Sequence, residues 1–269
     1  MKEIEAYFID LDGTYVDIGH KNVSSANKQS VRQALKQGKK VIFATGRNMT
    51  INTMWIINST NVKDAIFMNG AIIMMDGKIV KESRISSAAV NALNDYFIKT
   101  KPFVVLNSLI KKWVHTGKYY LYPLFFLIGT KILPMKALNT FYPVVHKYNI
   151  FSFSKKKIQK IVSDLKALNL DISIATSYKD RVIEITSKEA SKGLAIEYVL
   201  QKYQIDKENA VHIGDSLNDY SAKNYVGKLI AMSDSNESFL KLVDYVGPNH
   251  KKSGVAKIIK NNEFYAKIK

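Results

Sequence analysis

Cysteine is absent from the chain, and glycine and proline are sparse. The 269 residues include 13 glycines and 5 prolines, with 46% hydrophobic and 23% charged residues. Without cysteine there are no disulfides, thiolate metal sites or cysteine nucleophiles. The low glycine and proline content excludes collagen-like repeats and argues against disorder. We therefore expect a globular protein that buries a sizeable core.

Long hydrophobic runs are also scarce. One run at 119–129 (YYLYPLFFLIG) suggests a membrane contact, but Lys118 and Lys131 bound it well below the roughly 20 apolar residues of a spanning helix. We expect this run to be buried or interfacial. Residues 1–5 include no cleavable apolar segment, so we expect no secretory or transit peptide and a cytoplasmic protein.

Acidic residues are outnumbered by basic ones. The chain has 40 lysines and arginines against 23 acidic residues, a formal net charge of +17. This balance permits an anionic partner, such as a phosphorylated metabolite, nucleic acid or anionic lipid. The basic residues are spread along the whole chain, as a compositional bias toward solvated faces also predicts. No stacking motif accompanies the run 155–157 (KKK), so we expect no specific nucleic-acid partner.

Both ends of the chain alternate short apolar strands with helices. Strands are predicted at 7–9, 40–44, 65–68, 210–213, 228–232 and 245–246, and a hairpin at 72–80. Helices are predicted at 24–38, 48–58 and 192–203. This alternation indicates an α/β protein with a mainly parallel sheet.

The middle of the chain has a different texture. Aromatic residues are frequent from about 83 to 186, and the periodicity predicts an α+β module inserted into the α/β pattern. Its predicted helices are 90–97 and 158–168, and its predicted strands are 104–106, 172–174 and 182–185. Residues 113–148 have no assignment from the sequence.

Two carboxylates follow the first predicted strand. Asp10 and Asp12 are one residue apart, and Gly13 and Thr14 then turn the backbone. Adjacent aspartates at a strand end repel each other unless a cation lies between them or one is protonated. The same residues also suit an ordinary Asx turn. The pair alone leaves a metal site and a turn as alternatives.

Polar residues follow other predicted strands in the same way. Ligands gather beyond the carboxyl ends of parallel strands, so these residues are expected to meet in space. They are Asp10 and Asp12, Thr45 and Gly46, Lys192, and Asp215 with Asn218 and Asp219. Carboxylates suit Mg²⁺, whereas a hydroxyl, backbone N–H groups and a lysine suit phosphate. Together they favour phosphoryl transfer.

The chain resembles the haloacid dehalogenase (HAD) superfamily, Cof-type phosphatase subfamily. The resemblance rests on FIDLDGT (8–14), ATGR (44–47), SKG (191–193) and GDSLND (214–219), with weaker likeness at MNGA (68–71) and SGVAK (253–257). It implies a Rossmann-like core made of 1–82 and 188–269. It also implies an inserted α+β cap at 83–187 that closes over the site and selects the substrate.

The resemblance further implies a Mg²⁺-dependent phosphatase of a small phosphorylated metabolite, a sugar phosphate or similar monoester. Asp10 would be the nucleophile that forms an aspartyl-phosphate, and Asp12 the general acid and base. Mg²⁺ would be held by Asp10, the backbone carbonyl of Asp12, and Asp215, with Asp219 orienting these ligands. The phosphoryl group would be bound by the Leu11 backbone, Thr45, Gly46, Lys192 and Asn218.

Some positions stay open or depart from the family pattern. Arg47 suits a substrate contact and a surface ion pair equally, and His212 is interpreted as a core histidine. Relatives commonly have Met-Gly-Asn where this chain has Met232-Ser233-Asp234, so the phosphate-side contact of that loop is open. The substrate, the oligomeric state and the role of the aromatic stretch 119–141 are also open.

Two other functions compete with hydrolysis. One is a basic nucleic-acid- or membrane-binding protein on a retained phosphatase scaffold, suggested by the charge and by the run 119–129. The other is a phosphotransferase or mutase, which would pass the phosphoryl group to a second alcohol instead of water.

Overall fold

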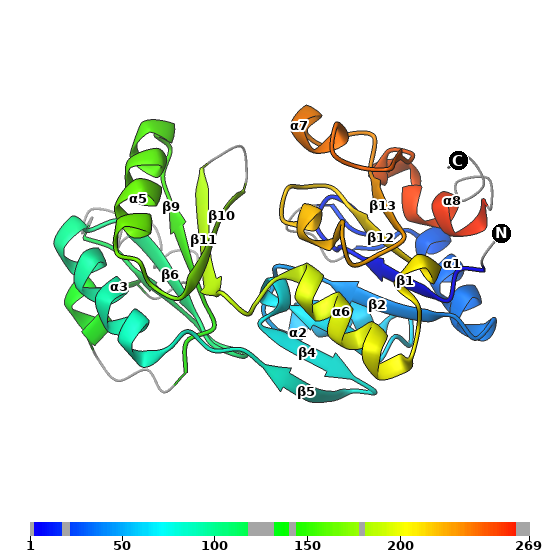
Figure 1. Cartoon of the computed structure of the whole chain (residues 1–269), viewed down its shortest axis with the longest axis horizontal. Helices are drawn as coiled ribbons and strands as arrows, with labels where there is room; N and C mark the ends of the chain where they lie inside the picture. Colours follow the sequence, from blue (N-terminus) through cyan, green and yellow to red (C-terminus); the bar gives the residue numbers. More distant parts are fainter. Residues whose placement is uncertain (1–2, 18–21, 118–131, 140–143, 178–180, 262–269) are drawn as a thin grey trace. The chain divides into compact units, whose positions relative to one another are not determined.

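The computed structural model describes residues 3–17, 22–117, 132–139, 144–177 and 181–261. The chain divides into two compact units (Figure 1). Unit 1 comprises Met1–Glu82 and Ser191–Lys269, and unit 2 comprises Ser83–Ala190. Within the described ranges, no helix has the length and apolar character needed to cross a membrane. The apolar run 119–129 lies outside these ranges, so its predicted burial stays a prediction.

Unit 1 is built on an eight-stranded sheet with the order β14-β13-β12-β1-β2-β3-β4-β5. Its strands are β1 Ala6–Ile9, β2 Lys40–Ala44, β3 Asp64–Phe67, β4 Ile72–Met75, β5 Lys78–Glu82, β12 Ala210–Gly214, β13 Lys228–Ala231 and β14 Tyr245–Val246. The strands from β14 to β3 pair in parallel, whereas β4 and β5 pair antiparallel as the predicted hairpin. The predicted mainly parallel sheet is therefore confirmed.

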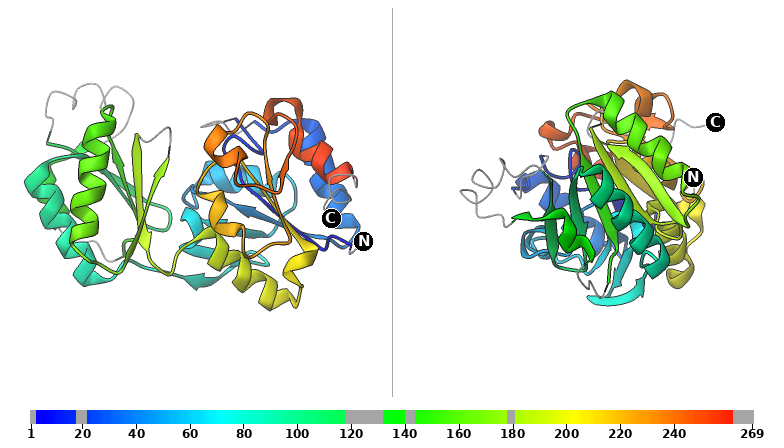
Figure 2. Two further views of the ribbon diagram at one scale, coloured as in Figure 1. Left: turned by 45° about the horizontal axis from the view of Figure 1, so that its top comes forward. Right: turned by 90° about the vertical axis from the view of Figure 1, so that its left-hand side faces the viewer.

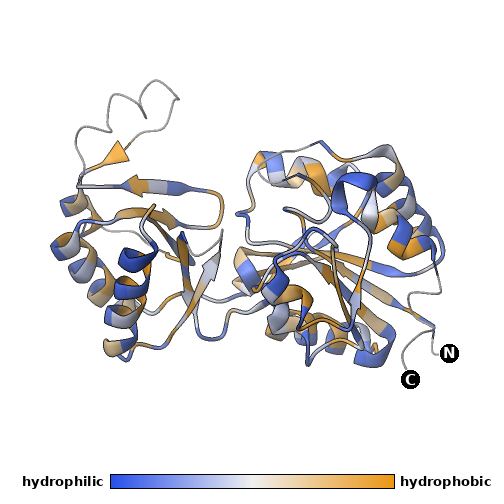
Figure 3. Cartoon of the chain, turned by 90° about the horizontal axis from the view of Figure 1, so that it is seen from above, coloured by the Kyte–Doolittle hydropathy of each residue, from blue (hydrophilic) through white to orange (hydrophobic). Residues whose placement is uncertain are grey.

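Helices cover both faces of this sheet. They are α1 Ser25–Lys36, α2 Ile51–Asn58, α6 Lys192–Tyr203, α7 Glu237–Leu240 and α8 Gly254–Lys260. Ile196 and Val199 of α6 pack with Phe8 of β1 and Ile42 of β2 in one buried cluster. Helices α1 and α8 lie side by side (Figure 2), and the Ala256 N–H donates to Asn27 Oδ1 at 3.0 Å. The strands between these layers are predominantly hydrophobic (Figure 3).

Unit 2 is an α+β module with a six-stranded sheet in the order β10-β11-β9-β6-β7-β8. Its strands are β6 Phe103–Asn107, β7 Lys112–His115, β8 Ile132–Leu133, β9 Lys147–Phe151, β10 Ile172–Ser177 and β11 Val182–Ser187. Its helices are α3 Ser87–Thr100 and α5 Lys155–Ala167. Side chains from both helices, including Phe97 and Ile161, share a core with Tyr148 of β9 and Ile183 of β11. Unit 2 thus has a hydrophobic core of its own.

Candidate active site

Strands β1 and β12 bring the two acidic motifs of unit 1 together. The strands pair in parallel with Ile9 opposite Ile213, so the residues that follow each strand are neighbours. The Asp10 N–H donates to the Ile213 carbonyl at 2.9 Å. After Asp10 the chain turns tightly, since the N–H groups of Tyr15 and Val16 both donate to the Leu11 carbonyl at 2.9 Å. The two motifs are therefore neighbours at the carboxyl ends of β1 and β12, although they are far apart in the sequence.

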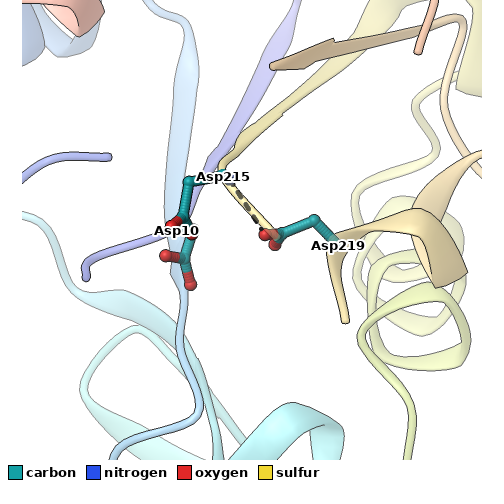
Figure 4. A group of neighbouring side chains, drawn as sticks. All are labelled: Asp10, Asp215 and Asp219. Atoms are coloured by element: carbon teal, nitrogen blue, oxygen red, sulfur yellow. Dashed lines mark hydrogen bonds between the residues drawn. The ribbon is translucent and has the colours of Figure 1, made fainter. Parts of the chain in front are cut away.

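Three carboxylates converge at this edge, as Figure 4 shows for Asp10, Asp215 and Asp219. One oxygen from each lies within 4.8 Å of the others. A Cβ added to Gly13 would come within 2.4 Å of Asp215 Oδ2, so the turn packs directly on that carboxylate. Converging carboxylate oxygens are the donors that Mg²⁺ prefers, and Asp10 and Asp215 therefore fit such an ion.

Burial gives these acids different proton affinities. Desolvation is the main cause that raises the pKa of Asp10 well above its usual range, and it raises the pKa of Asp215 to about 7. Burial also acts on Asp219, but the charge of Lys192 and the hydrogen bond from His212 outweigh it and lower the pKa of Asp219. Asp219 thus favours its ionised form, whereas burial disfavours the ionised forms of Asp10 and Asp215.

Lys192 connects two of the acids. It is the first residue of α6, whose N-cap Ser191 accepts a hydrogen bond from the Leu194 N–H. Its Nζ lies 2.5 Å from Asp10 Oδ1 and 2.6 Å from Asp219 Oδ1, and the side chain is fully buried. Burial alone would lower the pKa of Lys192, but the two carboxylates outweigh it and raise that pKa. Lys192 is therefore a fixed buried cation against Asp10.

Asp12 points to a different partner from Asp10. Arg47 holds its carboxylate in a two-pronged ion pair, with Nε 2.7 Å from Asp12 Oδ2 and the second guanidinium nitrogen 2.6 Å from Oδ1. The backbone N–H of Arg47 also donates to Thr45 Oγ1 at 3.1 Å in the loop after β2. Of the two alternatives for Arg47, the structure shows an ion pair, formed with the partly buried Asp12 of the first motif, and the substrate contact stays a prediction.

The remaining predicted phosphate ligands lie on the loops that follow β1, β2 and β12. Thr45 is fully buried and Gly46 is half-buried. Asn218 Nδ2 donates to Asn69 Oδ1 at 3.3 Å, which joins the loop after β12 to the turn after β3. The Leu11 side chain is fully buried, so only its backbone could face a ligand.

Two residues of this region had no role in the sequence interpretation. Asn69 belongs to MNGA, and the motif was recognised without a function for its amide. His212 was interpreted as a core histidine, and it is fully buried in β12. Its Nε2, however, lies 2.8 Å from Asp219 Oδ1. A polar side chain two residues before a glycine-aspartate motif was the available signal.

The loop that departs from the family pattern is joined to two other loops through His250. Asp234 Oδ2 lies 2.5 Å from His250 Nδ1, and the His250 N–H donates to Asp234 Oδ1 at 3.2 Å. His250 Nε2 lies 2.8 Å from Asp17 Oδ1 on the loop after β1. The acid that replaces the usual asparagine therefore contacts His250, which in turn contacts Asp17, and these contacts join three loops.

Comparison with known proteins gives a consistent family. A sequence model of the haloacid dehalogenase-like hydrolases matches residues 7–259. The chain is 25% identical over 300 residues to phosphatase YwpJ of Bacillus subtilis (strain 168), covering 94% of this chain and 98% of that protein. It is 24% identical over 285 residues to the 5-amino-6-(5-phospho-D-ribitylamino)uracil phosphatase YwtE of the same organism, covering 93% and 95%.

Solved structures share the fold. The subclass IIB sugar phosphatase BT4131 superposes with a TM-score of 0.79 at 21% identity, covering 95% of this chain and 98% of that one. A HAD/COF-like hydrolase from Plasmodium vivax gives 0.82 at 20% identity, covering 96% and 95%. These likenesses confirm the α/β fold class, and the family match confirms the resemblance stated from the motifs. The chain therefore belongs to the haloacid dehalogenase-like hydrolase family.

Proposed function

We propose that this enzyme is a Mg²⁺-dependent phosphatase of a small phosphorylated metabolite, a sugar phosphate or similar monoester. One observation carries the proposal: Lys192 holds Asp10 beside Asp215 at the carboxyl end of the central strands. A buried carboxylate with a fixed cation and a second acid nearby suits attack on phosphorus. Relatives named as phosphatases of phosphorylated small molecules support the substrate class.

Asp10 is assigned as the nucleophile. Lys192 fixes one of its oxygens at 2.5 Å, which limits rotation of the carboxylate. Attack by Asp10 on the phosphorus forms an aspartyl-phosphate and releases the alcohol, and water then hydrolyses this acyl phosphate to inorganic phosphate and the free Asp10 carboxylate. Bound Mg²⁺ would supply charge neutralisation for the phosphoryl oxygens, with Asp10, Asp215 and the Asp12 carbonyl as its ligands and Asp219 orienting them. Lys192, Asn218, Thr45, Gly46 and the Leu11 backbone are assigned to the phosphoryl oxygens.

Asp12 is assigned as the acid that protonates the leaving alcohol and then the base that activates water. In the described conformation both Asp12 oxygens are engaged by Arg47. Each of these oxygens has a second acceptor position, on which Asp12 could carry the proton that it passes. Arg47 would keep Asp12 aside until a substrate phosphate competes for the guanidinium.

Unit 2 is proposed to act as the cap that selects the leaving group. The support is its place in the chain, as an independent module inserted between Glu82 and Ser191 of unit 1. The cytoplasmic location stays a prediction.

The test is phosphate release from a panel of sugar phosphates, nucleotides, pyridoxal phosphate and an aryl phosphate, with and without Mg²⁺. We expect release that requires Mg²⁺ and falls by at least about 10³-fold in Asp10→Asn, because the amide cannot form the acyl phosphate. Asp76→Asn is the matched control, since Asp76 lies in the exposed β4–β5 turn and has the left-handed φ of 49° that asparagine tolerates. Full activity in Asp10→Asn would refute the mechanism.

The two competing functions give different results in the same assay. A phosphotransferase would pass the phosphoryl group to an added sugar alcohol, so the released phosphate would fall short of the alcohol produced. A binding protein on a retained scaffold would hydrolyse nothing on the panel and would bind DNA or anionic vesicles in a salt-dependent way.

A further inference from the structure

His212 occupies an unusual place for a histidine in a central strand. It lies in the middle of β12, opposite Phe8 of β1, and its side chain is fully buried. A carboxylate can only accept hydrogen bonds, so His212 Nε2, which faces Asp219 Oδ1 at 2.8 Å, carries a ring proton.

The Asp219 carboxylate is engaged on both oxygens. Oδ1 accepts from His212 and from Lys192, at 2.8 and 2.6 Å. Oδ2 accepts from the N–H groups of Asp215 and Ser216, both at 3.1 Å. A carboxylate offers about four acceptor positions, so these contacts use all of them. A Cβ added to Gly214 would come within 2.3 Å of Asp219 Cγ, so packing also fixes this carboxylate.

This arrangement gives Asp219 a purpose distinct from that of its two acidic neighbours. Its bonds direct Oδ1 toward Lys192, and Lys192 in turn holds Asp10. Without the donor on His212, Lys192 would hold Oδ1 without that second contact, and Oδ1 could rotate about Oδ2, which its two backbone donors still hold. Rotation would tilt Lys192 away from Asp10.

We propose that His212 is a positioning residue for the reaction: its Nε2–H fixes Asp219, which aligns Lys192 against the nucleophile Asp10. The chain of contacts is His212, Asp219, Lys192 and Asp10, and each link is a hydrogen bond between fully or almost fully buried side chains. The proposal rests on the proposed function, because alignment of Lys192 matters only if Asp10 attacks phosphorus.

Three substitutions of His212 separate positioning from packing. In His212→Gln the side-chain amide nitrogen reaches the place of Nε2, whereas in His212→Asn it is shorter and corresponds to Nδ1. His212→Leu keeps the volume without a donor. We expect kcat to fall about tenfold or more in the leucine and asparagine variants and to stay within about threefold of wild type in the glutamine variant. KM should change little, because substrate contacts remain.

The control is Tyr203→Phe, which removes a hydrogen bond of 2.7 Å to the buried acid Asp64 at the amino end of β3. It should lower the unfolding temperature and leave kcat unchanged. A general loss of stability in β12 would lower kcat equally in all three His212 variants. That result, or a leucine variant with wild-type kcat, would overturn the proposal. If the leucine variant does not fold, the difference in kcat between His212→Gln and His212→Asn still tests the proposal.

Crystal structures of the variants give a readout that does not depend on turnover. We expect Asp219 Oδ1 to keep its contact with Lys192 in His212→Gln and to rotate away in His212→Leu. An unchanged Asp219 and Lys192 in the leucine variant would refute the positioning role even if the protein hydrolysed no phosphate. Conversely, a rotated Asp219 in a protein without Mg²⁺-dependent activity would support the contact chain and refute the proposed function.

Discussion

Individual acids in this site respond to pH in opposite directions. Asp10 and Asp215 bind protons more tightly in the folded protein than in the unfolded chain, because burial disfavours their charged forms. Asp219 does the reverse, since Lys192 and His212 stabilise its charge. The buried His212 has a lowered pKa and therefore favours folding as the pH rises toward its ordinary value of 6.5.

The contribution of Asp215 can be isolated by comparing wild type with Asp215→Asn. The pKa of Asp215 is raised from 3.8 to about 7 on folding, so its contribution to wild-type stability falls as the pH rises from about 4 to 7. We expect the unfolding free energy of the metal-free Asp215→Asn variant to increase relative to that of metal-free wild type as the pH rises across this window. Urea unfolding at several pH values with a chelator measures it.

Addition of Mg²⁺ provides the control for the Asp215 prediction. A cation bound to ionised Asp215 stabilises the folded protein, so Mg²⁺ should raise wild-type stability at pH 8 more than at pH 5.5. Asp215→Asn should respond weakly at both. A constant difference between the two proteins from pH 4 to 7 would contradict the assigned cause.

Residue identities in the site could be predicted from motifs, but pairings could not. The strand-end rule predicted that Asp10, Lys192, Asp215 and Asp219 meet, and they do. The pairing of Arg47 with Asp12 depends on side-chain rotamers in a loop, which spacing does not encode. The catalytic and binding roles of these residues stay predictions.

A buried ion pair joins two strands of unit 2. Lys147 of β9 donates to Glu184 of β11 at 2.8 Å, and both side chains are almost fully buried. Removing one partner of a buried ion pair leaves the other charge in a low-dielectric interior, whereas removing both can be nearly neutral. Lys147 lies in the stretch 113–148, which has no assignment from the sequence, so the pair could not be predicted from strand positions.

Lys147→Met should therefore lower the unfolding free energy of unit 2 by about 3–5 kcal/mol. The double variant Lys147→Met, Glu184→Leu should recover most of that loss. Lys188→Met is the matched control, because Lys188 pairs with Asp171 at 3.8 Å with both side chains exposed, and it should cost at most about 1 kcal/mol. Chemical denaturation of the three variants measures the effect, and equal losses in Lys147→Met and Lys188→Met would contradict it.

Helix and strand positions were largely predictable because their signals are local. The hairpin around 76–77 and the helices α1, α2 and α6 follow from turn residues, caps and apolar spacing. Strands β7 and β8 fall within 113–148 or at its edge, a stretch without an assignment from the sequence. The pairing of β7 with β6 and of β8 with β7 comes from tertiary contacts, which periodicity does not report.

Among the described residues each unit has a hydrophobic core of its own, and unit 1 has a further small cluster around Phe239. Mg²⁺ binds, on our proposal, to unit 1 alone, whereas the Lys147–Glu184 pair lies in unit 2. Separate cores favour separate unfolding transitions.

Calorimetry can test that separation. We expect Mg²⁺ to raise the temperature of one transition and Lys147→Met to lower that of the other. Asp10→Asn should weaken the shift caused by Mg²⁺ without affecting the second transition. A single transition that moves with both changes would show that the units unfold as one.

The order of synthesis constrains when this site can exist. Strand β1 leaves the ribosome before its neighbour β12 and before the lysine that holds Asp10, since Asp10 and Lys192 have a sequence separation of 182. At typical elongation rates of about 5–20 residues per second, roughly 10–40 s separate the two. During that interval unit 2 can fold around its own core, whereas the central strand pair of unit 1 cannot yet form. The contact between Asp10 and Lys192 can therefore form only after unit 2 has been synthesised.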